Sequence, residues 1–132
     1  MNILKQSSRE SGVITVLIVE DTPSERELLG HYLRQGGYQV IDAENAKEGF
    51  DRALLQRPDV IVTDIVMPGM SGFELCRSLK RHPETAEVPV VICSSKDQYV
   101  DRLWGLKQGA TIYMTKPFTR EELIHAIQSL VR

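Results

Sequence analysis

Three carboxylates follow apolar runs in the sequence. Glu20 and Asp21 come directly after the run TVLIV, and Asp64 follows the run VIVT. Carboxylates gathered at one rim repel each other unless a cation neutralises them. A hard divalent ion such as Mg²⁺ prefers oxygen ligands and keeps positions open for water or a phosphoryl group. We therefore expect a Mg²⁺ site if these two runs are neighbouring strands.

Two more polar residues follow later apolar runs. Ser94 ends the run PVVICS, and Lys116, followed by Pro117, ends the run TIYMTK. A metal ion, an ammonium and a hydroxyl directed at phosphoryl oxygens are the groups that stabilise phosphoryl transfer. Asp64, at the end of a buried strand, is then the candidate nucleophile that would form an acyl phosphate.

The elements that must position these residues alternate along the chain. Five short runs rich in β-branched residues are separated by longer stretches with helical spacing. They occupy residues 15–19, 38–42, 60–64, 89–94 and 111–116. This alternation predicts an α/β fold, a doubly wound five-stranded parallel sheet in the order 2-1-3-4-5 with five helices. Ligands of such sheets bind at the carboxyl ends of the strands, where Asp64 and Lys116 would meet.

The five intervening stretches carry helix signals. Apolar residues recur three and four positions apart and predict that each helix packs a stripe on the sheet, the fourth stripe being Val100, Leu103 and Leu106. Capping-box signatures begin at Thr22, Asn45, Ser71, Ser95 and Thr119. Gly36, Gly37 and Gly109 stand where left-handed helix ends favour glycine.

Composition excludes several classes of protein. The 132 residues, with a net charge of −2, suit one folded domain at residues 15–132 after a flexible leader at residues 1–14. We predict no nucleic-acid partner, no membrane insertion and a cytoplasmic location, because basic patches and long apolar segments are missing from the sequence. Cys76 and Cys93 are predicted to be buried hydrophobes, and the three histidines lack metal-site spacing.

From Val16 to Arg132 the chain resembles the receiver domain of bacterial two-component response regulators, the CheY-like family. The resemblance rests on Glu20-Asp21, Asp64 with Met67-Pro68-Gly69 and Gly72, Ser94, and Tyr113 with Lys116-Pro117-Phe118. It implies that Asp64 accepts a phosphoryl group from a histidine kinase. It also implies that Mg²⁺ is bound directly by Asp21, Asp64 and the backbone carbonyl of Val66, and through water by Glu20.

The same resemblance implies the remaining roles. Lys116 would hold the phosphoryl group, Ser94 would swing toward it, and Tyr113 would change rotamer in concert. Pro68, Gly69, Gly72 and Pro117 would be structural turn residues, and the Lys116–Pro117 bond is commonly cis in this family. Such a protein is a phosphoacceptor in signalling that promotes only its own phosphorylation and dephosphorylation.

Residues 94–110 are similar to the stand-alone PilH-like regulators of twitching-motility and phototaxis systems. We expect no effector domain after Arg132, and therefore output through a protein-binding surface that includes Tyr99, Arg102 and Tyr113. Trp104 is expected to be partly buried at the edge of its helix stripe. Val66 offers no polar side chain to orient a hydrolytic water, which predicts slow loss of phosphate.

Other functions are compatible with parts of the pattern. An aspartyl phosphohydrolase would need a second acid two residues after the first, where Val66 stands. A flavodoxin-like FMN carrier would need glycines and hydroxyls where the acidic loop EDTPSE lies. Two further functions are also compatible with the sequence. The receiver could serve as a phosphate sink for a shared kinase, or it could bind partners without phosphorylation.

Overall fold

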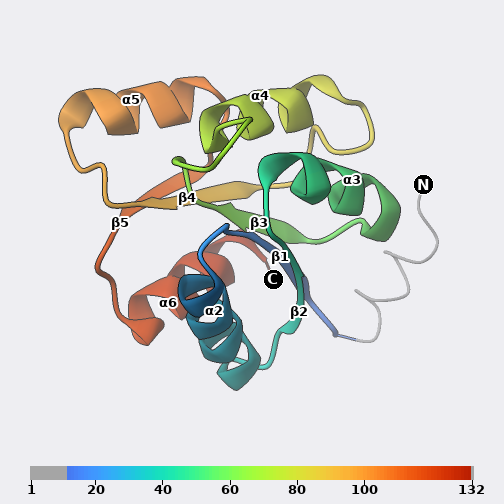
Figure 1. Cartoon of the computed structure of the whole chain (residues 1–132). Coiled ribbons are helices and arrows are strands. Elements are labelled where there is room, and N and C mark those ends of the chain that lie inside the picture. Colours follow the sequence, from blue (N-terminus) through green and yellow to red (C-terminus); the bar gives the residue numbers. More distant parts are fainter. Residues whose placement is uncertain (1–11, 132) are drawn as a thin grey trace.

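The structure, a computed structural model, describes residues 12–131, so residues 1–11 of the predicted leader lie outside the described residues. Strands and helices alternate along this part of the chain (Figure 1). The strands are β1 (Thr15–Val19), β2 (Gln39–Ala43), β3 (Val60–Thr63), β4 (Val90–Ser94) and β5 (Ile112–Thr115). The helices are α2 (Pro23–Gln35), α3 (Ala46–Gln56), α4 (Gly72–Arg81), α5 (Tyr99–Lys107) and α6 (Arg120–Leu130).

The five strands form one parallel sheet in the order β2-β1-β3-β4-β5, which confirms the predicted topology. Helices α3, α4 and α5 cover one face of the sheet, and α2 and α6 cover the other (Figure 1). The register pairs Val19 of β1 with Thr63 of β3. The residues that follow these two strands therefore emerge side by side at one edge.

The apolar core has two halves, one on each face of the sheet. One half includes Leu17, Ile61, Leu75 and Leu79, and the other includes Val16, Leu33, Val62, Leu123 and Ile127. Every residue of the central strands β3 and β4 is buried, as expected for parallel strands covered on both sides. The edge strands β2 and β5 are only partly buried.

Helix α5 departs from the prediction. Its stripe of Val100, Leu103 and Leu106 is 62%, 51% and 49% exposed, and Trp104, which we expected to be partly buried, is also exposed. The buried residue of this helix is Gly105. A Cβ atom there would stand 2.9 Å from the ring of Tyr113, so the helix backbone itself approaches the sheet. This close approach leaves the flanking apolar side chains at the surface.

Two of the five predicted capping boxes, at Ser71 and Thr119, are confirmed in full, and a third, at Asn45, has only the bond to the N-cap side chain. The side chains of Asn45, Ser71 and Thr119 each accept a hydrogen bond from the backbone amide three residues later. The prediction at Ser95 is wrong, because α5 begins at Tyr99 after Gln98. Thr22 does precede α2, but its side chain makes no capping bond.

Other local predictions have clear outcomes. Gly37 and Gly109 have positive φ angles of 89° and 109°, as predicted, whereas Gly36 keeps a right-handed conformation. Cys76 and Cys93 are free and buried, as predicted. Within residues 12–131, none of the helices has both the length and the apolar character that a membrane crossing requires.

Candidate functional site

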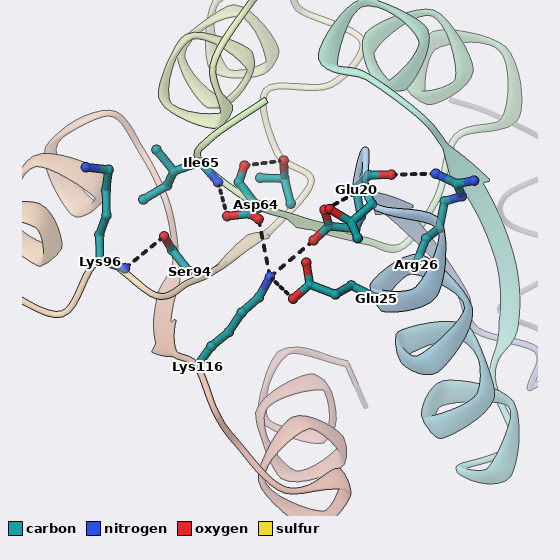
Figure 2. Close-up of polar contacts among 10 residues, drawn as sticks. Glu20, Glu25, Arg26, Asp64, Ile65, Ser94, Lys96 and Lys116 are labelled. Atoms are coloured by element: carbon teal, nitrogen blue, oxygen red, sulfur yellow. Dashed lines mark hydrogen bonds and ion pairs between the residues drawn. The ribbon is translucent and has the colours of Figure 1, made fainter. Parts of the chain in front are cut away.

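Asp64 stands at the end of β3, in the middle of the sheet edge. Its backbone N–H donates to the carbonyl of Val19, which ties the strand end to β1. The two carboxylate oxygens have different partners: Oδ1 accepts from the N–H of Ile65 at 2.6 Å, and Oδ2 accepts from Lys116 Nζ at 3.2 Å (Figure 2). The backbone therefore orients the carboxylate and leaves Oδ2 paired only with a side-chain ammonium.

Lys116 brings three carboxylates together. Its ammonium lies 3.2 Å from Glu20 Oε1, 3.1 Å from Glu25 Oε1 and 3.2 Å from Asp64 Oδ2. Figure 2 shows the lysine side chain reaching from the end of β5 into this group of acids. An ammonium has three N–H donors, and here each has a carboxylate partner. Three carboxylates against one cation leave the cluster with excess negative charge.

Glu20 is the most buried of the three acids, with a side chain only 1% exposed. Its Oε2 accepts from the N–H of Thr22 at 3.1 Å, and its backbone carbonyl accepts from Arg26 Nη1 at 2.8 Å. These bonds fix the loop between β1 and α2. They also account for the missing return bond of the predicted capping box, because the Thr22 N–H that the Glu25 side chain would accept from already donates to Glu20.

The electrostatics of the cluster follow from burial and from charge. Burial raises the pKa of the Glu20 carboxyl above its usual value, and the nearby Asp64 charge raises it further, against the lowering effects of the Thr22 N–H and of Lys116. Burial by itself would lower the pKa of Lys116, but Asp64, Glu20 and Glu25 outweigh it and the pKa is raised. Lys116 therefore stays charged at every physiological pH.

Glu25 is a site residue that sequence reasoning missed. The carboxylates of Glu20, Glu25 and Asp64 offer oxygen atoms within 4.8 Å of one another. In the sequence, Glu25 looked like the acid of a capping box with Thr22. Its position in the first turn after β1 was the available signal, because that turn lies over the edge where Asp64 ends its strand.

Two of the predicted Mg²⁺ ligands, Asp21 and Val66, lie outside this group of three carboxylates. Asp21 is partly buried and lines a separate cavity together with Pro68, Gly69 and Met70. The side chain of Val66, two positions after Asp64, is 63% exposed. The predicted Mg²⁺ ligands therefore do not all belong to one cluster. Glu20 and Asp64 belong to the acid group, whereas Asp21 lies beside the turn that follows Asp64.

The donor set fits a hard cation. Glu20, Glu25 and Asp64 offer carboxylate oxygens within 4.8 Å of one another, and oxygen is the ligand class that Mg²⁺ prefers. Three carboxylates face the single Lys116 ammonium, so the buried cluster lacks positive charge even with Lys116 in place. A divalent cation beside these residues would supply that charge.

The predicted switch residues share one neighbour. Ser94 is buried, and its Oγ accepts from the N–H of Lys96 at 3.2 Å. The Tyr113 hydroxyl donates to the carbonyl of the same residue at 2.7 Å. The two side chains are thus linked through one residue of the loop before α5.

The predicted partner-face residues lie on or beside α5. Tyr99 is 79% exposed at the start of the helix. Arg102 is also exposed and donates to Thr115 Oγ1 of β5 at 2.8 Å. Tyr113 lies under Gly105 of the same helix. The three residues therefore belong to one surface of α5 and β5.

The turn residues shape access to Asp64. Gly69 has a φ of 78°, a region that favours glycine, and the Lys116–Pro117 peptide bond is cis. A Cβ atom on Gly72 would overlap the backbone carbonyl of Asp64, so α4 begins directly against the aspartate.

Beside the acid cluster, a cavity of about 400 Å³ is lined by Asp64 and Lys116 together with Glu25, Leu28, Leu29, Tyr32, Ser95, Pro117 and Phe118.

Comparisons with known proteins agree with this geometry. Residues 16–128 match the family described as the response regulator receiver domain. Protein PilH of Pseudomonas aeruginosa is 43% identical over 116 residues, which cover 88% of this chain and 96% of PilH. The phosphate regulon regulatory protein PhoB of the same organism is 36% identical over 118 residues, and this chain spans about half of it, 52%.

Solved structures give the same result. The chemotaxis protein CheY4 of Vibrio cholerae superposes with a TM-score of 0.85 at 30% identity, covering 90% of this chain and 99% of CheY4. The signal receiver domain of a histidine kinase from Syntrophus aciditrophicus superposes with a TM-score of 0.83 at 36% identity, covering 89% of each chain.

Proposed function

Because the chain belongs to the response regulator receiver domain family, we propose that it is a phosphoacceptor of a two-component phosphorelay, with Asp64 as the acceptor and a histidine kinase as the donor. The observation that carries the proposal is the asymmetric pairing of Asp64. Oδ1 is held by the Ile65 N–H, and Oδ2 meets the Lys116 ammonium. Oδ2 is then the oriented nucleophile.

The transfer would proceed by attack of Asp64 Oδ2 on phosphorus. The O–P bond forms as the P–N bond to the donor imidazole breaks, and the imidazole leaves with the bonding electron pair. Lys116 would donate to a phosphoryl oxygen. Asp21, Asp64 and the backbone carbonyl of Val66 would hold Mg²⁺, and Glu20 would contact it through water. The bound Mg²⁺ would neutralise charge on the phosphoryl oxygens.

We propose that the phosphoryl group changes the protein-binding surface through Lys96. Ser94 Oγ accepts from the Lys96 N–H, and Tyr113 donates to the Lys96 carbonyl. If Ser94 turns to donate to a phosphoryl oxygen, the loop before α5 loses one of its two anchors. That loss would bias Tyr113 toward a second rotamer, which is a shift of population between two arrangements.

A specific observation favours a messenger over a phosphate sink. The α5 face, defined as Tyr99, Val100, Leu103, Trp104 and Leu106, exposes five large side chains on one short helix. Gathered apolar surface of this kind marks protein-binding sites. We propose that this face, with Arg102 and Tyr113, binds the output partner. The 43% identity with PilH supports the proposal that the protein acts as a stand-alone regulator of motility.

The test is intact mass after incubation with acetyl phosphate, with and without Mg²⁺. We expect one phosphoryl addition that requires Mg²⁺ and is lost in Asp64→Asn. Asp51→Asn, which changes an exposed aspartate on α3, should behave like wild type. Absence of phosphoryl addition to wild type would count against the proposal and favour a receiver fold that binds partners without phosphorylation.

A further inference from the structure

Glu25 has a contact that neither its helix nor the fold requires. It belongs to the first turn of α2, yet its carboxylate lies 3.1 Å from Lys116 Nζ, 91 positions away in the sequence. In Figure 2 it points from α2 toward the same ammonium as Asp64 and Glu20. The capping bond that its position in α2 would favour is absent. The side chain thus contacts the site and makes no capping bond to the helix end.

The ammonium has no spare donor. Its three N–H groups face Glu20, Glu25 and Asp64, so a phosphoryl oxygen can reach Lys116 only by displacing one of them. Glu20 cannot easily leave, because it is 1% exposed and also holds the Thr22 N–H. Glu25 is 44% exposed, and its carboxylate can turn into water at little cost.

Glu25 also lies on the approach to the nucleophile. It shares the lining of the 400 Å³ cavity with Asp64 and Lys116. A phosphodonor that enters this cavity brings a phosphoryl group with negative charge close to the Glu25 carboxylate. Like charges at this range repel, and most strongly where burial reduces screening by water.

We propose that Glu25 is a positioning residue that holds Lys116 in the resting state and must give up the ammonium to the incoming phosphoryl group. This inference rests on the proposed function. In the step, the Asp64 Oδ2–P bond forms and the bond from phosphorus to the donor breaks. For acetyl phosphate, acetate leaves with the electron pair. Lys116 keeps its protons and exchanges one carboxylate partner for a phosphoryl oxygen.

The test compares phosphorylation rates in Glu25→Gln, which removes the charge, and Glu25→Asp, which keeps the charge but shortens the side chain. Glu27→Gln, on the same helix and exposed, is the matched control. With acetyl phosphate and saturating Mg²⁺, we expect Glu25→Gln to react about fivefold faster than wild type, the size expected for loss of one partly exposed ion pair. Glu25→Asp should be faster by a smaller factor, and Glu27→Gln should match wild type.

Salt separates direct contact from long-range repulsion. In about 1 M salt the screening length falls to about 3 Å. The Glu25–Lys116 pair is in contact and partly buried, so a gain that comes from it should shrink but remain measurable there, whereas a gain from repulsion alone should disappear. Disappearance of the gain would therefore overturn the positioning role.

A spectroscopic measurement tests the contact without any phosphodonor. The ¹H–¹⁵N signal of the Lys116 ammonium, assigned by its loss in Lys116→Met, should shift in both Glu25 variants and not in Glu27→Gln. An unchanged signal would overturn the inference, because the ion pair would not exist in solution.

The outcomes separate the two proposals. If wild type is phosphorylated and the Glu25 variants react at the rate of Glu27→Gln or more slowly, the inference fails and the proposed function stands. If the Glu25 variants react at the same rate as Glu27→Gln, the partner that gives up Lys116 is Asp64. If they react more slowly than Glu27→Gln, Glu25 supports the reaction. If wild type accepts no phosphoryl group, both proposals fall together.

Discussion

Gly72 lies directly against the backbone carbonyl of Asp64, so closely that a Cβ atom on Gly72 would overlap the carbonyl oxygen. The N–H of Gly72 also donates to the carbonyl of Ile65 at 2.9 Å. The first residue of α4 therefore fixes the turn that carries the proposed phosphoacceptor. Backbone cannot move aside as a flexible side chain can.

Gly72→Ala should displace this turn. We expect the free energy of unfolding to fall by about 2–3 kcal/mol, the cost of overpacking against fixed atoms. This change in the free energy of unfolding is measured by urea unfolding. The control is Gly69→Ala, whose Cβ would meet no atom within 4 Å but whose φ is 78°. It should cost only about 1 kcal/mol of backbone strain. Equal losses in the two variants would contradict the packing argument.

Lys116→Met should destabilise the protein in the absence of divalent cations. It leaves the buried Glu20 and the partly buried Asp64 without their shared cation. We expect the free energy of unfolding to fall by about 1–3 kcal/mol, as when a buried charge loses its partner. Lys107→Met, at the exposed end of α5, should have little effect. Mg²⁺ should stabilise Lys116→Met more than wild type, and failure to do so would count against a cation site beside Asp64.

The Glu20 carboxyl predicts a pH dependence. Burial raises its folded-state pKa above the ordinary 4.5, so the folded protein binds this proton more tightly than the unfolded chain does. The contribution of Glu20 to stability is therefore complete below pH 4.5 and is lost as pH rises through the raised folded-state pKa. The free energy of unfolding of Glu20→Gln, measured relative to wild type, should therefore increase from acidic to neutral pH, because only wild type has a buried carboxyl that must ionise.

The measurement is urea unfolding of wild type and Glu20→Gln across that pH range without divalent cations. Glu27→Gln provides the comparison for an exposed acid, and its difference from wild type should not change with pH in this way. A gap between Glu20→Gln and wild type that stays constant with pH would show that the buried carboxylate carries no penalty.

Val66→Asn should shorten the lifetime of the phosphorylated protein. Position 66 is exposed two residues after Asp64, where an amide could orient a water toward the acyl phosphate. We expect decay several-fold faster than in wild type, measured by intact mass after the donor is removed. Val66→Ala, which adds no polar group, should decay at about the rate of wild type. An unchanged rate in Val66→Asn would contradict the predicted role of this position.

The α5 face should contribute little to folding. Leu103 is 51% exposed and Leu79 of α4 is fully buried, so the same substitution tests both environments. Leu79→Ala should cost about 2–5 kcal/mol, as for other core leucines. Leu103→Ala should stay within about 0.5 kcal/mol of wild type. A large loss from Leu103→Ala would mean that the helix is packed and not free to bind a partner.

Much of this molecule is determined by local sequence. The β-branched runs and the helical spacing between them predict the parallel sheet and its order. Parallel strands end at a common edge, so the sequence alone assigns Glu20, Asp64, Ser94 and Lys116 to one rim. The caps at Asn45 and Thr119 also follow from residues only three positions apart.

Only the tertiary structure decided the choices that depend on distant partners. The Thr22–Glu25 signature resembles a cap, but Glu25 binds Lys116 because an ion pair with a partly buried ammonium outcompetes a hydrogen bond to an amide. The stripe on α5 resembles a core face, but Gly105 brings the helix backbone against Tyr113 and leaves that stripe exposed. Spacing along the chain describes which residues share a face of a helix. It does not determine how closely that face approaches the sheet.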